Sequence, residues 1–179
     1  MKCIGVGVIN EGVWGIAMHG DVVAVGKAGG HSPDRIMLFS YTSGALLRQF
    51  GGWGTDEGQY KSVMGIEFTA DGKHMIIVDY NNSRVSLATV KGVFVRFIGE
   101  EVLGDGYEDV ILNSAGEVVV ADYWNDRVCV FSQVDGTLLR TWGANGTDNS
   151  QFNSPTALAT SRNRLYVLDE HRARVHVFE

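Results

Sequence analysis

One short pattern recurs along this 179-residue chain at a spacing that leaves few folds open. An aspartate is followed five positions later by an arginine and a valine, in I-V-D-Y-N-N-S-R-V at 77–85, V-A-D-Y-W-N-D-R-V at 120–128 and V-L-D-E-H-R-A-R-V at 167–175. Arg35 begins a fourth, partial copy, and successive arginines are 49, 43 and 47 residues apart. A period of about 40 to 50 residues is typical of a four-stranded propeller blade.

Other elements recur in phase with this pattern. A glycine turn and an apolar-aromatic strand follow each arginine, as in S-G-A-L-L-R-Q-F-G at 43–51, K-G-V-F-V-R-F-I-G at 91–99 and D-G-T-L-L-R-T-W-G at 135–143. A polar loop then ends in E-G-Q-Y at 57–60 or N-S-Q-F at 149–152. Glycine makes up 23 of the 179 residues, about 13% against a usual 7% or so, which indicates many tight turns and an all-β fold.

These elements together resemble the NHL repeat, and the resemblance covers nearly the whole chain. It implies an all-β fold, a β-propeller of four-stranded antiparallel blades, with four repeats in a single domain at 1–179. Blades stack face to face, so the inner strands should be apolar throughout, as Met75–Val78 and Val118–Ala121 are. Blade 3 departs from the family pattern because Asp109 replaces the glycine of its first strand.

The ends of the chain suggest how the ring closes. The last strand expected, Arg174–Phe178, is a third strand, and residues 2–9 precede a first strand, where a fourth strand would stand. Pairing of residues 2–9 with the last blade would close a four-bladed ring without an exposed edge. The NHL resemblance implies six blades more often. The chain could instead be part of a longer protein, or two copies could complete a larger ring as a homo-oligomer.

The recurring acidic and basic residues are predicted to be structural. Each aspartate closes a second strand and can accept N–H groups of the following turn and pair with the arginine that opens the third strand. The residues assigned this role are Asp79, Arg84, Asp122, Arg127, Asp169 and Arg174. Blade 1 lacks the aspartate. Gly26 is taken as its equivalent, nine positions before Arg35, which predicts a longer, glycine-rich loop.

The loops that join second and third strands lie on one face of such a propeller, and this face is the predicted partner-binding surface. Aromatic and arginine side chains are common anchors of protein interfaces, and exposed aromatics also stack on single-stranded RNA. Trp124 and His171 are expected to be the most exposed. The candidate residues are Lys27, His31, Tyr80, Tyr123, Trp124, His171 and Arg172.

No catalytic residue, metal ligand or cofactor is assigned. Some NHL-like propellers, such as the amidating lyase family, use histidine-bound zinc, which requires several histidines to converge on one metal. The positions of the five histidines relative to the expected strands spread them over both ends of the propeller, so they do not converge. A metal-dependent lyase or hydrolase with an axial site therefore remains a third alternative, behind two binding functions.

The net charge and the two cysteines limit the functions and cellular locations that the chain can have. The net charge of −6 argues against nonspecific nucleic-acid binding, and no apolar run approaches the roughly 20 residues of a membrane span. Cys3 and Cys129 are isolated and are predicted to be free, buried thiols in a reducing, cytoplasmic compartment.

The leading prediction is a non-catalytic scaffold for a protein partner, as in NHL domains of tripartite-motif ubiquitin ligases. An RNA-binding propeller is the alternative that the same family implies.

Overall fold

The computed structural model describes residues 3–5, 9, 12–27, 35–100, 102 and 106–178. In this part of the chain, fifteen strands form four antiparallel sheets, and each sheet is made of strands consecutive in the sequence. Blade 1 contains β1 (Val13–His19), β2 (Val22–Lys27), β3 (Arg35–Ser40) and β4 (Leu46–Phe50). Blade 2 contains β5 (Val63–Phe68), β6 (His74–Asp79), β7 (Arg84–Thr89) and β8 (Phe94–Ile98).

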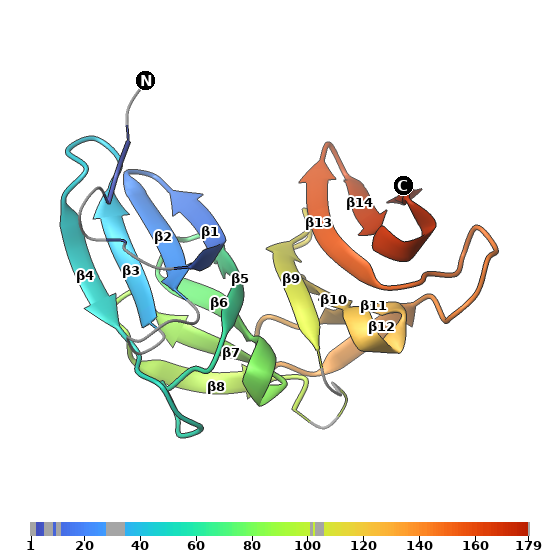
Figure 1. Cartoon of the computed structure of the whole chain (residues 1–179), viewed down its shortest axis with the longest axis horizontal. Coiled ribbons are helices and arrows are strands. Elements are labelled where there is room, and N and C mark those ends of the chain that lie inside the picture. Colours follow the sequence, from blue (N-terminus) through green and yellow to red (C-terminus); the bar gives the residue numbers. More distant parts are fainter. Residues whose placement is uncertain are drawn as a thin grey trace.

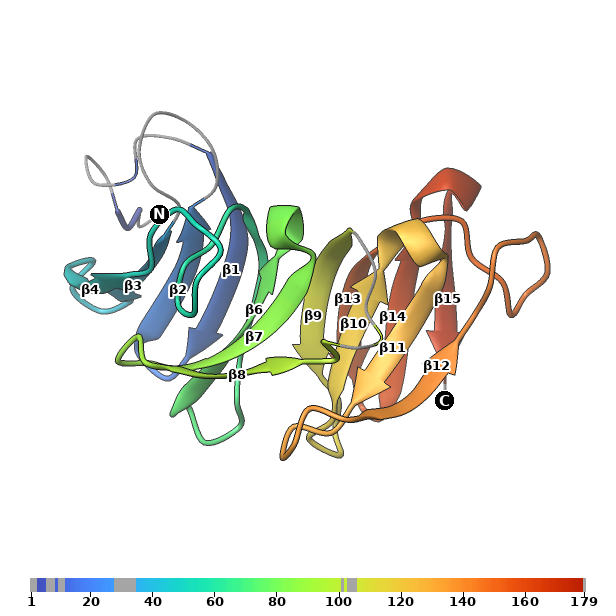
Figure 2. The ribbon, with the colours of Figure 1, turned by 90° about the horizontal axis from the view of Figure 1, so that it is seen from below.

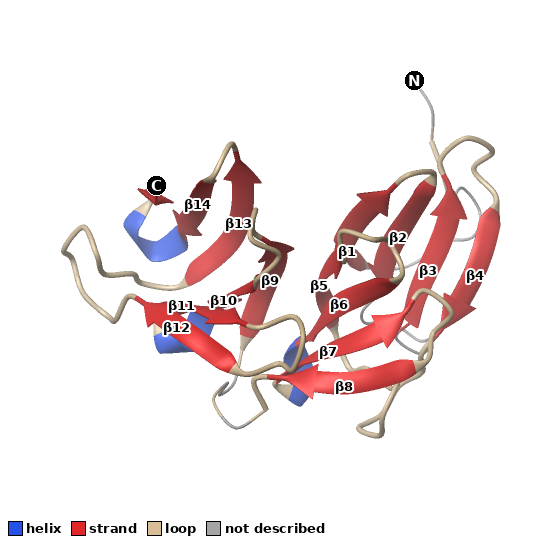
Figure 3. Cartoon of the chain, turned by 180° about the vertical axis from the view of Figure 1, so that it is seen from behind, coloured by secondary structure: helices blue, strands red, loops and turns tan. Residues whose placement is uncertain are grey.

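The second half of the chain repeats this order. Blade 3 contains β9 (Tyr107–Leu112), β10 (Val118–Asp122), β11 (Arg127–Phe131) and β12 (Leu138–Trp142). Blade 4 contains β13 (Pro155–Ser161), β14 (Arg164–Asp169) and β15 (Arg174–Phe178). The described helices are single 3₁₀ turns, which join second to third strands: η1 (Tyr80–Asn82), η2 (Tyr123–Asn125) and η3 (Glu170–Arg172) (Figure 3). None of these helices could cross a membrane.

The sheets follow one another around an axis as the blades of a β-propeller. The first strands of blades 2, 3 and 4 each pack against the first and second strands of the preceding blade, so β1, β5, β9 and β13 lie on the inner side. Figure 1 shows the blades along an arc from blade 1 to blade 4, and Figure 2 shows η1, η2 and η3 at the same end. Among the described strands, no pair that joins blade 1 to blade 4 packs to this extent.

The core consists of the seams between blades. We call the side of a blade that meets the next blade its forward face, and the opposite side its rear face. The forward face of blade 1 packs on the rear face of blade 2, and the same arrangement recurs between blades 2 and 3 and between blades 3 and 4. Blades 2 and 3 are therefore covered on both sides. As predicted, Met75–Val78 and Val118–Ala121 are fully buried.

Asp109, the residue that replaces a first-strand glycine, lies at the seam between blades 3 and 4. Its Oδ2 accepts a hydrogen bond from the backbone N–H of Leu158 on β13, at 2.8 Å. Burial raises the pKa of this carboxyl group, and the backbone N–H groups of Leu158 and Val110 oppose the rise. The departure from the repeat thus supplies a polar link between two blades where a glycine would give only close contact.

The N-terminal segment does not take the place expected for it. In the described chain, β15 pairs only with β14, so the fourth blade has three strands. The described residues Ile4 and Ile9 instead pack against the rear face of blade 1. The expected pairing of residues 2–9 with the last blade is thus wrong for these residues. An apolar N-terminal segment can pack on the rear face of blade 1 or pair with the edge of blade 4, and local sequence does not distinguish these two positions.

The register of blade 1 corrects a second expectation. Lys27 pairs with Arg35 as Asp79 pairs with Arg84 and Asp122 with Arg127, so Lys27 rather than Gly26 takes the aspartate position. The connection is therefore three residues longer than in the other blades, rather than four, because Lys27 precedes Arg35 by eight positions instead of five.

The two cysteines are free thiols, as predicted, but only one of them is buried. Cys129 lies inside the seam between blades 2 and 3, where burial raises the pKa of its thiol to about 12. Cys3 is exposed, which corrects the expectation that both thiols are buried.

Candidate partner-binding face

The turns at one end of the propeller are held by buried ion pairs. Asp79, Asp122 and Asp169 are fully buried. Each accepts a hydrogen bond from the Nε of the arginine five positions later, at 3.1, 2.6 and 3.2 Å respectively. The residue that ends each 3₁₀ turn has a left-handed backbone, with φ near 50° in all three blades. The three turns are therefore held in the same shape.

The same ion pairs also fix the long loops that lead into their own blades. The guanidinium of Arg84 donates to the carbonyl oxygens of Thr55, Asp56 and Gln59, at 2.6, 3.1 and 2.6 Å. Asp79 accepts the backbone N–H of Lys61 at 2.7 Å. Blade 4 repeats the arrangement, with Arg174 bonded to three carbonyls of its loop. These contacts make this end of the propeller a rigid platform.

An array of aromatic rings crosses this platform and links three blades. The indole Nε1 of Trp124 on η2 donates a hydrogen bond to the hydroxyl of Tyr80 on η1, at 3.2 Å. The rings of Tyr123 and Trp124 meet edge to face at 5.0 Å, and Tyr123 meets His171 on η3 at 6.2 Å. We call these four residues the aromatic row. Four of the seven residues predicted for a partner-binding face are thus brought together.

Trp124 is the most prominent member of the aromatic row. Trp124 is 62% exposed, yet other residues hold its indole ring in place on three sides. Tyr80 and Tyr123 hold two of these sides, and Gly106 lies under the indole so closely that a Cβ at that position would fall 1.6 Å from Cδ1 of the indole. A large, exposed and ordered aromatic ring loses little conformational freedom on binding, which favours it as an anchor.

Two carboxylates that perturb each other lie near the His171 end of the aromatic row. Glu108 on β9 is half-buried, and Glu170 on η3 is exposed beside His171. Burial raises the pKa of Glu108, and the neighbouring charges of Glu170 and Asp109 raise it further. Carboxylates close enough to perturb one another create a negative potential. A cationic or apolar ligand suits this face better than a phosphate backbone.

Two more of the predicted face residues, Lys27 and Arg172, are described, and neither joins the aromatic row. Lys27 is buried at the end of β2, in the position that an aspartate holds in the other blades, so it is not presented to a partner. Arg172 lies on η3 and is half-buried. His31 lies outside the described residues.

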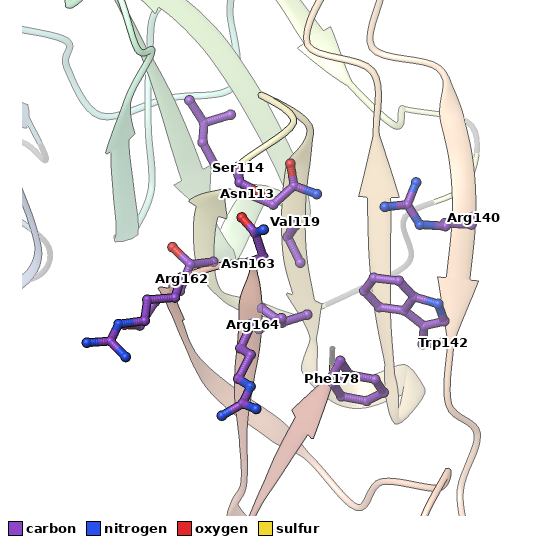
Figure 4. Close-up of a pocket in the computed structure, with 13 residues that line it drawn as sticks. Asn113, Ser114, Val119, Arg140, Trp142, Arg162, Asn163, Arg164 and Phe178 are labelled. Atoms are coloured by element: carbon purple, nitrogen blue, oxygen red, sulfur yellow. The ribbon is translucent and has the colours of Figure 1, made fainter.

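A cavity lies at the other end of the propeller from the aromatic row, between blades 3 and 4. The cavity measures about 500 Å³, and Figure 4 shows its aromatic wall, Trp142 and Phe178, with Arg140 beside Trp142. The two rings stack at 5.4 Å, and the guanidinium of Arg140 lies 5.1 Å from the Trp142 ring. Arg162 and Arg164 also line the cavity. The aromatic wall suits a flat apolar group, whereas the charge of Arg140 is already paired with Glu117.

This cavity was not predicted, although the repeat contains a signal for it. Thr160 lines the cavity at a position where the equivalent residues are Phe68 in blade 2 and Leu112 in blade 3, as their strand registers show. Phe68 is buried in its seam. A threonine in place of a large apolar side chain leaves the seam between blades 3 and 4 open at this end.

Glu117 beside the cavity makes the stability of the chain sensitive to acid. Hydrogen bonds from Arg140 and then Asn113 lower the pKa of Glu117 to about 2. A lowered carboxylate pKa stabilises the fold above the unfolded pKa, and this contribution is lost as the pH falls from about 5 towards 2. Because Arg140 is partly exposed, we expect a contribution of only about 1 kcal/mol. Denaturation of the parent chain and of Glu117→Gln across this range should show a shallower acid loss for the variant, and identical slopes would contradict the assignment.

Comparison with known proteins places the chain in a fold class. No family model matches the sequence, and no curated protein matches it. The crystal structure of the computationally designed Ika4 protein is similar, with a TM-score of 0.65 and 18% identity over 95% of this chain and 92% of that one. A protein of unknown function from Bacteroides caccae has a TM-score of 0.69 and 17% identity, over 88% of this chain and 56% of that one. Virginiamycin B lyase from Staphylococcus aureus has a TM-score of 0.65 and 14% identity, over 94% and 55%.

These likenesses define the class of the protein as a β-propeller of four antiparallel blades. The chain spans about half the length of the Bacteroides caccae protein and of the lyase. The narrower assignment to the NHL repeat has no matching family model and stays a prediction.

Proposed function

We propose that this chain is a non-catalytic binding module, of NHL type, that uses the aromatic row to hold a protein partner. The observation that carries the proposal is the ordered, exposed indole of Trp124, held by Tyr80 and Tyr123 at the junction of three blades. Interface hot spots are enriched in such tryptophan and tyrosine side chains on rigid surroundings. The adjacent Glu108 and Glu170 favour a partner segment that combines an apolar or aromatic side chain with a basic one.

The partner chemistry can be tested with peptides selected from a displayed random library on the 179-residue chain. We expect the selected peptides to be rich in aromatic and basic residues. Trp124→Ala should weaken their binding at least thirtyfold, because a hot-spot truncation costs about 2 kcal/mol or more. The measurement is titration calorimetry on parent and variant.

Val134→Ala is the matched control, because Val134 is an exposed apolar residue away from the aromatic row, in the turn before β12. This variant should bind the selected peptides as the parent does. If Trp124→Ala and Val134→Ala bind equally well, the aromatic row is not the binding surface.

RNA binding is the alternative that the same aromatic rings allow, since bases stack on exposed aromatics. The carboxylates around the aromatic row make it the weaker candidate. Titration with a single-stranded RNA at increasing salt distinguishes the two. Tight binding that weakens steeply with salt would favour RNA over a protein partner.

A metal-dependent lyase has no residue set to support it in the described chain. One similar structure is named a lyase, but at 14% identity the likeness shows the fold alone. Within residues 12–27, 35–100 and 106–178 no three His, Cys, Asp or Glu side chains gather as a metal site requires. Metal analysis of the purified protein tests this alternative.

A reducing, cytoplasmic location would suit the free thiols of Cys3 and Cys129.

A further inference from the structure

The two end blades expose apolar surface that the inner blades bury. On the forward face of blade 4, Val175 is 57% and Val177 is 52% exposed, and Leu168 beside them is also exposed. The register of the third strands makes Val175 equivalent to Ile36, Val85 and Val128, and all three of these are fully buried against a following blade. Blade 4 therefore carries the same type of surface that packs on a next blade three times within this chain.

The rear face of blade 1 is the matching surface. Ile16 is 71% exposed on β1, and Val13 and Met18 on the same strand are also exposed. The register of first strands against second strands identifies their equivalents in blade 2, which are buried against blade 1: Val63, Ile66 and Phe68. The exposed residues of β1 are thus those that would meet a preceding blade.

We propose that two copies of this chain assemble head to tail into one ring, with the forward face of blade 4 of each copy on the rear face of blade 1 of the other. The repeated seam provides the argument for this occupant, because three interfaces of this design already hold the chain together. Two such arcs give a ring of eight blades, a number that propellers adopt. The interface joins two different surfaces, so it forms a closed assembly only if the rotation between copies brings the ends together.

Part of the receiving face is covered within one chain. Ile4 and Ile9 pack on four residues of that rear face, whereas β1 stays uncovered. Docking therefore starts on β1 and requires Ile4 and Ile9 to leave. The outer edge of β15 has no paired strand among the described residues.

Sedimentation of the 179-residue chain tests the assembly. We expect a species of about 39 kDa, twice the 19.5 kDa of one chain, and no larger polymer. Val175→Glu/Val177→Glu should remain monomeric at concentrations at which the parent is dimeric, because two charges would be buried without partners. Both positions are exposed in the single chain, so this variant should keep its fold and its thermal stability. Val134→Glu, at an exposed site outside both faces, should still form the dimer.

A mixing experiment distinguishes a head-to-tail contact from a symmetric contact between two copies of blade 4. Ile16→Glu blocks only the rear face of blade 1, so it should be monomeric alone. Mixed with Val175→Glu/Val177→Glu, it should regain a dimer, because one interface between the two variants is intact. A parent chain that stays monomeric up to about 100 µM would overturn the proposal. So would an Ile16→Glu variant that dimerises like the parent, or a filament in place of a closed dimer.

Discussion

Replacing Asp79 with alanine is expected to lower the free energy of unfolding by about 3 to 5 kcal/mol. The carboxylate is fully buried and accepts hydrogen bonds from the backbone N–H of Lys61, from Asn82 and from Arg84. The substitution leaves these half-buried donors without an acceptor and leaves the Arg84 charge unpaired, which costs more than the loss of contact alone. Urea denaturation followed by circular dichroism measures the change.

Two further variants separate this effect from a general loss of charge. Asp79→Asn keeps an oxygen for the N–H of Lys61 and should lose less stability than Asp79→Ala. Asp148→Ala removes a carboxylate from an exposed loop and should change the free energy of unfolding by no more than about 0.5 kcal/mol. If Asp79→Ala and Asp148→Ala are equally mild, the buried ion pair does not hold the turn as described.

Phe152→Ala should destabilise the chain by a similar amount, about 3 to 5 kcal/mol. Phe152 ends the polar loop N-S-Q-F and is fully buried in the seam between blades 3 and 4, where its ring meets His176 edge to face at 4.5 Å. Gly143 passes so close to the ring that a Cβ there would lie 2.2 Å from Cδ2 of Phe152. Truncation would therefore leave a cavity that the rigid surroundings cannot fill. Thermal and urea denaturation of the variant check this expectation.

Phe152→Leu is the control for the size of the cavity. Leucine fills most of the space of the ring, so this variant should lose clearly less stability than Phe152→Ala. Equal losses for the alanine and leucine variants would show that the aromatic ring itself, rather than the filled volume, stabilises the seam.

The sequence predicted the blades because their signals are local and repeated. An apolar run such as Met75–Val78 must be buried on both sides wherever it lies in a sheet, and the D-G turn at Gly136 requires the positive φ of 78° that the structure has. The register of blade 1 was predicted incorrectly because the connection before Arg35 differs in length from the others. The apolar pattern of the strands does not determine the length of the loop between them.

The candidate site was predicted in part for a comparable reason. Topology places second-to-third strand loops at one end, so Tyr80, Tyr123, Trp124 and His171 were expected on one face. Contact between their rings depends on the distance and angle between blades, which sequence spacing does not determine. The cavity beside Trp142 arises from Thr160, which is smaller than its equivalents Phe68 and Leu112 in the aligned repeats. Whether a smaller side chain leaves a cavity depends on how the neighbouring side chains pack, which sequence spacing does not determine.

The restriction of packing to adjacent blades has a consequence for how the chain opens. Blades 2 and 3 each have two packed neighbours, whereas blade 4 has one and contains three strands among the described residues. In such a one-dimensional array, cooperativity passes only from neighbour to neighbour, and a terminal unit can separate without disturbing the far end. In a single chain that has not assembled into the proposed ring, backbone amides of β15 should therefore exchange with solvent well before those of β6 and β10, so the molecule opens from blade 4 inward.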